Sequence, residues 1–173
     1  PQRTIQTVVR FGKPPAMHGH NDRMSVVWWA TGRPVLVDPA TATYTAGPAR
    51  TWSMSPQAHN TPIVAGRSYA PWVSVGLDSF AHRSAADTVL LTGSLYRVHQ
   101  HRRITVDPVN DRLTVLDTAA APVNQVWQLD PRWRLRSYNA TRSSARFSDA
   151  TGASLVSSTT GRIASVQSGA AGL

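Results

Sequence analysis

The residues best suited to chemistry lie in three short segments of the first 61 residues. The first segment carries His18 and His20, which flank Gly19; the second ends an apolar run with Asp38; the third contains His59. Two histidines at positions i and i+2 of an extended chain point to the same side, which suits a shared ligand. Two imidazoles and one carboxylate form a donor set that suits a borderline metal, with zinc as the first choice. Composition alone leaves an alternative open, in which each histidine is an ordinary surface or core residue.

Other catalytic and binding chemistries find little support in the sequence. The chain has no cysteine, which excludes disulfides, a thiol nucleophile and a cysteine-based zinc finger. We find no G-x-S-x-G nucleophile motif and no glycine-rich phosphate loop. A second histidine pair, His99 and His101, is not followed by an aspartate at a matching spacing. His101, which Arg102 and Arg103 follow, is a candidate for contact with an anionic sugar.

The segments that must position these residues are short and alternate between apolar and polar residues. This period of two, interrupted by Pro, Gly, Asn and Asp, predicts an all-β protein: an antiparallel, supersandwich-like β-sandwich of about a dozen short strands. The length of 173 residues fits a single domain over 1–173, with a frayed tail at 168–173. Residues 39–58 predict a long loop. We expect strands at 7–11, 24–30, 35–37, 61–65, 72–75, 88–98, 103–106, 113–116, 123–129, 133–138, 154–157 and 162–167.

The clearest hairpin is predicted at residues 103–116. Pro108 presets the backbone of a turn, and Asn110 and Asp111 tolerate the left-handed conformation. Alternation places Ile104 and Val106 on one face, together with two apolar residues of the partner strand.

The charge balance attracts polyanions. Lys and Arg number 18 and Asp and Glu 9, which gives a net charge of +9. Such a charge suits nucleic acid, anionic lipid or acidic polysaccharide. A nucleic-acid partner is not expected, because no RNP-like motif, helix-turn-helix pattern or basic helix is visible. No apolar stretch is long enough to predict a membrane span.

Four separated segments resemble one family in their order and spacing. They are Phe11-Gly12, His18-Gly-His20-x-Asp22, Gly32-Arg33-Pro34-x-Leu36-Val37-Asp38-Pro39 and Ala58-His59-Asn60-Thr61. Together they resemble the C-terminal β-sandwich region of heparinase II/III-like polysaccharide lyases. Looser similarity follows around Tyr96–Arg103, the 103–116 hairpin and Trp127–Pro131, so that the resemblance covers residues 8 to 135. The sequence departs from the family pattern in Met17 and in the residues after Pro39, where a glycine is usual.

The resemblance implies a metal ion, usually zinc, held by His20, Asp38 and His59. It also implies that His18 reaches into the active cleft and contacts the uronate of the substrate. For Asp22 we expect a role either in supporting the metal ligands through hydrogen bonds or in fixing the loop. A helical toroid that precedes the sandwich in this family, and forms the other wall of the cleft, is absent from this sequence. We therefore expect the chain to be the C-terminal part of a larger lyase.

Lyases of this family cleave acidic polysaccharides by β-elimination at a uronic acid, which requires a base, an acid and a donor to the carboxylate. The chain offers His18 as a catalytic donor, and Tyr44 and Arg50 from the long loop as further contacts. We therefore expect the isolated chain to be inactive. The identity of the polysaccharide stays open, and a secreted or periplasmic location follows from the substrate class.

The alternative is a non-catalytic carbohydrate-binding or interaction module of the same fold. Exposed tryptophans would favour it, with Trp52 and Trp72 as the candidates in or near loops. The other four tryptophans lie in predicted strands, where we expect them to pack in the core: Trp28, Trp29, Trp127 and Trp133.

Overall fold

A computed structural model describes residues 5–14, 19–39 and 41–159 of the chain. The chain divides into two compact units, Pro1–Gln128 and Leu129–Leu173, and each is described by itself. The prediction of a single domain stays a prediction.

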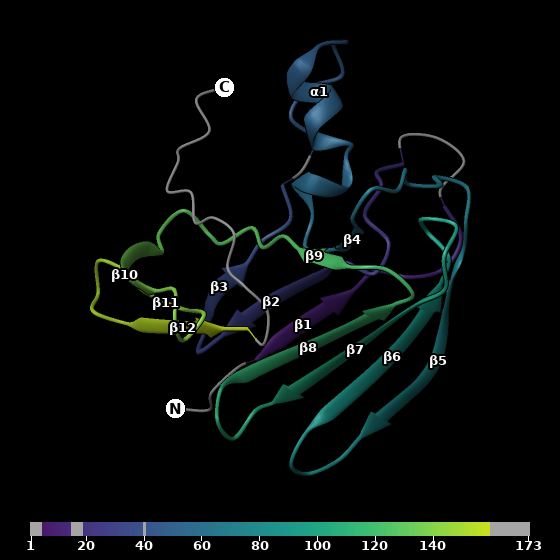
Figure 1. The fold of residues 1–173 in the computed structure, drawn as a ribbon. Helices are drawn as coiled ribbons and strands as arrows, with labels where there is room; N and C mark the ends of the chain where they lie inside the picture. Colours follow the sequence, from purple (N-terminus) through teal and green to yellow (C-terminus); the bar gives the residue numbers. More distant parts are fainter. Residues whose placement is uncertain (1–4, 15–18, 40, 160–173) are drawn as a thin grey trace. The chain divides into compact units, whose positions relative to one another are not determined.

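The described residues are almost entirely β-structure, in antiparallel sheets (Figure 1). The first unit contains a three-stranded sheet β1-β2-β3, a four-stranded sheet β5-β6-β7-β8 and the pair β4-β9. Its strands are β1 Gln6–Val9, β2 Val26–Ala30, β3 Arg33–Leu36, β4 Pro62–Val64, β5 Val75–His82, β6 Asp87–Gly93, β7 Gln100–Asp107, β8 Arg112–Ala119 and β9 Val123–Gln125. The second unit contains one sheet, formed by β10 Arg134–Asn139, β11 Ser144–Ser148 and β12 Ser154–Ser158. The predicted all-β sandwich is confirmed.

The core of the first unit lies between the inner faces of its sheets. Met24, Leu91 and Leu95 are fully buried in one apolar cluster, which residues of β4 and β5 complete. Ile104 of β7 is also fully buried, and together with Val9 of β1 it lines a common apolar cavity. Burial of these alternating residues is the main force that holds the two sheets together.

The hairpin β7–β8 has the predicted register. Ile104 faces Val115, and Val106 faces Leu113. The carboxylate of Asp107 accepts hydrogen bonds from the turn, including the backbone N–H of Asn110 at 3.0 Å, and Asp111 adopts a left-handed φ of 48°. The hydrogen bonds to its carboxylate hold the pKa of Asp107 below its ordinary value, and the bond from the Asn110 side chain is the largest cause. The turn residues therefore set the register, as expected from their types.

Several predicted strands differ from the observed ones. Trp72 to Ser74 precede β5 and are not strand, while β5 itself and β11 were not predicted. The predicted strand 88–98 ends at Gly93, because Ser94 to Arg97 form a turn in which Arg97 has a φ of 59°. The predicted strand 162–167 and the tail 168–173 lie outside the described residues.

Trp29 is not in the core, contrary to expectation. Trp28 is 6% exposed and Trp29 is 43% exposed. Neighbouring residues of a strand point to opposite faces, so only one of the two tryptophans can face the core.

The long loop after β3 contains a short helix, α1 Pro48–Ser53, and a 3₁₀ turn, η1 Pro56–Ala58. Figure 1 shows α1 extending from the strands. Among the described residues, no helix has the length and apolar character needed to cross a membrane.

Candidate functional site

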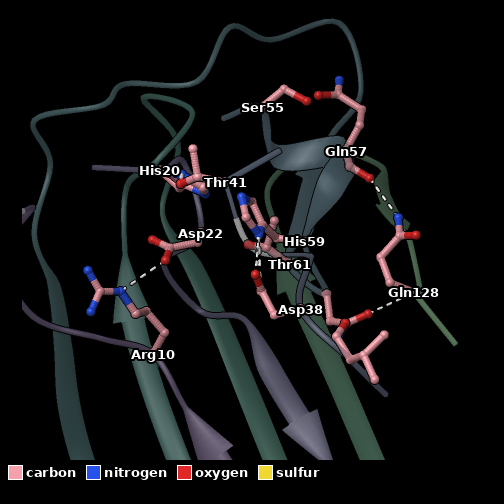
Figure 2. A network of polar contacts seen from close by, with 12 residues as sticks. Arg10, His20, Asp22, Asp38, Thr41, Ser55, Gln57, His59, Thr61 and Gln128 are labelled. Carbon is pink, nitrogen blue, oxygen red and sulfur yellow. Dashed lines mark hydrogen bonds and ion pairs between the residues drawn. The ribbon is translucent and has the colours of Figure 1, made fainter. Parts of the chain in front are cut away.

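Three segments from the ends of strands bring the predicted site residues together in the first unit. His20 lies ahead of β2, Asp38 follows the end of β3, and His59 lies just before β4. Figure 2 shows all three side chains in one network of polar contacts. The fold therefore places side chains that are 18 to 39 positions apart in the sequence near one another.

His59 is the buried centre of this network. Its side chain is fully buried, and its Nδ1 lies 2.9 Å and 3.0 Å from the two carboxylate oxygens of Asp38. An ionised carboxylate can only accept hydrogen bonds, so Nδ1 is the donor, and the neutral ring then carries its lone pair on Nε2. That Nε2 atom is buried, and no hydrogen-bond partner for it is found within the described part of the chain.

His20 lies beside His59, with 5.2 Å between the ring centroids. Its Nε2 lies 3.0 Å from the hydroxyl oxygen of Thr41. Burial is the largest cause that lowers the pKa of His20 below its ordinary value, and the neighbouring His59 lowers it further. A lowered pKa favours the neutral imidazole, which is the form that binds metals.

The segment that carries His20 is held by two contacts made by the residues that follow it. The carboxylate of Asp22 forms an ion pair with Nε of Arg10 at 3.1 Å, which connects the segment to the end of β1. The backbone N–H of Asn21 donates to the carbonyl of Met54, next to α1, at 3.0 Å. These contacts agree with the loop-fixing role expected for Asp22.

Tyr44 and Arg50 lie together on the α1 loop. The guanidinium of Arg50 lies 5.5 Å from the ring centroid of Tyr44, and it donates a hydrogen bond to the carbonyl of Thr43. The side chain of Tyr44 is 72% exposed. The positive charge of Arg50 is also one of the causes that lower the pKa of His20. The two residues therefore present an aromatic face and a cation on the α1 loop, and the charge of Arg50 acts on His20.

The three predicted metal ligands do not form a coordination cluster as their side chains stand. Among the described residues, no group of three or more His, Cys, Asp or Glu side chains is arranged to hold a metal ion. Asp38 contacts His59, and His20 contacts Thr41. The ligand assignment stays a prediction.

The remaining predicted site residues are His18 and His101. His18 lies outside the described residues. His101 lies on β7, where alternation places it on the face opposite to Arg102. Since Arg102 donates to the carbonyl of Asn60, next to His59, His101 points away from the side of the sheet that supports His59.

Three residues in contact with the site segments were not among the predicted site residues. Thr41 bonds to His20, Asn60 follows His59, and Arg102 is buried beneath them. Arg102 forms a bidentate ion pair with Asp117 of β8, at 2.6 Å and 2.8 Å. The alternation that places Ile104 and Val106 inside also places Arg102 inside, so its burial was predictable from the period of two.

The described residues thus form antiparallel sheets with a buried His–Asp pair and a second histidine beside it. The sequence profile described as heparinase II/III-like, C-terminal, matches residues 2–171. The chain therefore belongs to the heparinase II/III-like family and corresponds to its C-terminal region.

Solved structures show the same fold. The heparan sulfate lyase HepC from Pedobacter heparinus is similar with a TM-score of 0.75 and 16% identity, over 87% of this chain and 24% of that one. A heparinase III is similar with a TM-score of 0.71 and 15% identity, over 82% of this chain and 23% of that one. The chain thus spans about a quarter of the length of these relatives. No curated protein matches the chain.

Proposed function

We propose that the chain is the C-terminal β-sandwich module of a polysaccharide lyase, which holds a structural metal ion and forms one wall of the active cleft. The observation that carries the proposal is the convergence of His20, Asp38 and His59 from three separate segments. Family membership supplies the context, since one relative of the same fold is named a heparan sulfate lyase.

The donor types of His20, Asp38 and His59 suit a zinc ion, and Asp38 would have to turn from Nδ1 of His59 to share the ion, because the side chains as they stand form no coordination cluster. The buried Nε2 of His59 has no partner within the described residues, and a second imidazole lies beside it. His20, Asp38 and His59 would hold the ion. A structural ion of this kind stabilises the fold, because its ligands are brought together only when the chain folds.

The proposed substrate is an acidic polysaccharide that contains uronic acid. During β-elimination negative charge grows on the uronate carboxylate, and positively charged or N–H groups stabilise it. Arg50, whose charge acts on His20, and Tyr44 next to it would contact the sugar, and His18 would donate to the uronate. His101, on the opposite face of β7, would contact a more distant part of the polysaccharide. A helical toroid would supply the rest of the acid–base machinery, and a secreted or periplasmic location would follow from the size of the substrate.

The test is the metal content of the purified chain, measured by mass spectrometry, together with its melting temperature. We expect one zinc ion per chain. His20→Ala and Asp38→Ala should each lose the ion and melt at a lower temperature, because removal of a ligand uncouples metal binding from folding. His18→Ala is the matched control and should keep its metal. A wild-type chain without stoichiometric metal would overturn the ligand assignment.

A non-catalytic carbohydrate-binding module is the second candidate, and exposed aromatic residues favour it. Trp72 is 73% exposed, Tyr44 is 72% exposed, and Trp52 is 40% exposed. Aromatic faces of this kind stack on sugars and attract cations. Titration of tryptophan fluorescence with acidic oligosaccharides, in wild-type protein and Trp72→Ala, would support this candidate if the signal saturates and the variant binds more weakly. A DNA fragment that competes equally well would argue against it.

A further inference from the structure

Asn60 is fully buried, and its side-chain amide makes three hydrogen bonds. Its Nδ2 donates to the backbone carbonyls of Val26 and Val37, each at 2.9 Å. Its Oδ1 accepts from the backbone N–H of Gln128 at 2.6 Å. A buried amide with this many partners is rigid, since loss of any one partner would leave a buried polar atom unpaired.

These bonds connect the two segments that carry the His59–Asp38 contact. Asn60 follows His59 directly, and Val37 precedes Asp38 directly. The bond from Asn60 to the carbonyl of Val37 therefore joins the same two segments as the contact between the side chains of His59 and Asp38. Gln128 closes the arrangement, because its carbonyl accepts from the N–H of Val37 at 2.9 Å.

The backbone of Asn60 is held from the other side by Arg102. One nitrogen of the Arg102 guanidinium donates to the carbonyls of Asn60, at 2.6 Å, and Met24, at 2.7 Å. The rest of the guanidinium is paired with Asp117, which also accepts from the side chain of Gln125 at 2.6 Å. The buried ion pair thus connects Asn60 to β7 and β8.

We infer that Asn60 is a positioning residue that holds His59 against Asp38. It sets the distance between the two segments, and with it the orientation of the His59 ring. The inference concerns the folded chain itself, and its consequence for metal affinity rests on the proposed function. Partners that orient a metal-binding histidine typically contribute about 10–100-fold to metal affinity.

The first test is made on the metal-free protein by NMR. The Nδ1–H proton of His59, buried and bonded to a carboxylate, should give a slowly exchanging signal far downfield. Asn60→Ala should abolish it. The matched control is Thr61→Val, which removes one buried hydrogen bond, from Thr61 to the carbonyl of Arg23 at 2.6 Å, next to the same site. The control should keep the His59 signal.

Asn60→Asp is a second variant, which keeps the test decisive if Asn60→Ala does not fold. Aspartate has nearly the same shape and still accepts from Gln128, but it cannot donate to the two carbonyls. We expect it to lose the His59 signal as Asn60→Ala does. Retention of the signal in both variants, at the intensity of Thr61→Val, would overturn the inference.

The second test is calorimetric titration of the same variants with zinc. We expect Asn60→Ala to bind zinc about 10–100-fold more weakly than Thr61→Val. Equal affinities would contradict the inference. A wild-type chain that binds no zinc would refute the proposed metal site, while the NMR comparison would still decide the role of Asn60.

Discussion

Tyr69 and Tyr96 show what burial does to a single polar atom. Their rings meet edge to face with 5.3 Å between centroids, and both hydroxyls are buried. Burial raises the pKa of Tyr69 to about 12 and raises that of Tyr96 further above its ordinary value. The folded state thus holds these protons more tightly than the unfolded state does, and this stabilising effect is complete below pH 10 and lost as the pH rises through about 12.

We predict that replacing Tyr69 and Tyr96 by phenylalanine makes the chain more resistant to alkaline unfolding. The variant has no proton to lose there, and it no longer buries two hydroxyl groups. Melting temperatures at pH 7 should be equal to or above those of wild type, and the difference should widen between pH 10 and 12. A variant that is less stable than wild type at both values would show that the hydroxyls have partners.

At the scale of single residues, candidate site residues are easier to predict from the sequence than the hydrogen-bond partners of those residues. His20, Asp38 and His59 could be selected because their chemistry and spacing are visible in the sequence. The bond from His20 to Thr41 and the bridge from Asn60 to Val37 could not be, because they depend on how two loops meet after folding. Hydroxyl and amide side chains accept many partners, so their identity alone specifies none.

At the scale of elements, the β7–β8 hairpin was predictable because its turn residues and its alternation agree. β5 was missed because Gly76, Asp78 and Ser79 interrupt the apolar pattern, and a bulge follows Leu77. β11 was missed because it is short and polar, although Ala145 and Phe147 alternate on its buried face. Strands whose burial comes from one or two residues leave a weak pattern.

The Arg102–Asp117 pair joins β7 to β8 inside the unit, and we predict that Arg102→Leu costs about 3–5 kcal/mol in the free energy of unfolding. The variant leaves Asp117, 4% exposed, as a buried charge without its partner. Arg102→Lys should recover little of this, because lysine cannot form the bidentate pair.

Urea unfolding checks this prediction, with Arg103→Leu as the matched control. Arg103 is the exposed neighbour on the opposite face of β7, so its replacement should change the free energy of unfolding by about 0.5 kcal/mol or less. Similar losses in the two variants would mean that the buried pair has no special role.

At the scale of the whole molecule, the chain corresponds to about a quarter of the solved relatives of the same fold. Catalysis of β-elimination needs a base, an acid and a carboxylate donor held in one geometry. The described residues of the α1 loop offer an arginine and a tyrosine but no complete set.

We therefore predict that the isolated chain does not cleave acidic polysaccharides. Absorbance of unsaturated uronate should stay at the level of a buffer blank with heparin, alginate and hyaluronan. A rise in absorbance that tracks the purified chain, and disappears in His18→Ala, would show that the chain carries a complete active site of its own.

The most direct test of the central claim is the X-ray absorption spectrum of the purified chain at the zinc edge. The account predicts a four-coordinate ion with nitrogen and oxygen ligands at about 2.0–2.1 Å, including two imidazoles, and loss of that signal in His59→Ala. A chain with no zinc edge, or with zinc bound only by water and unchanged in His59→Ala, would contradict it.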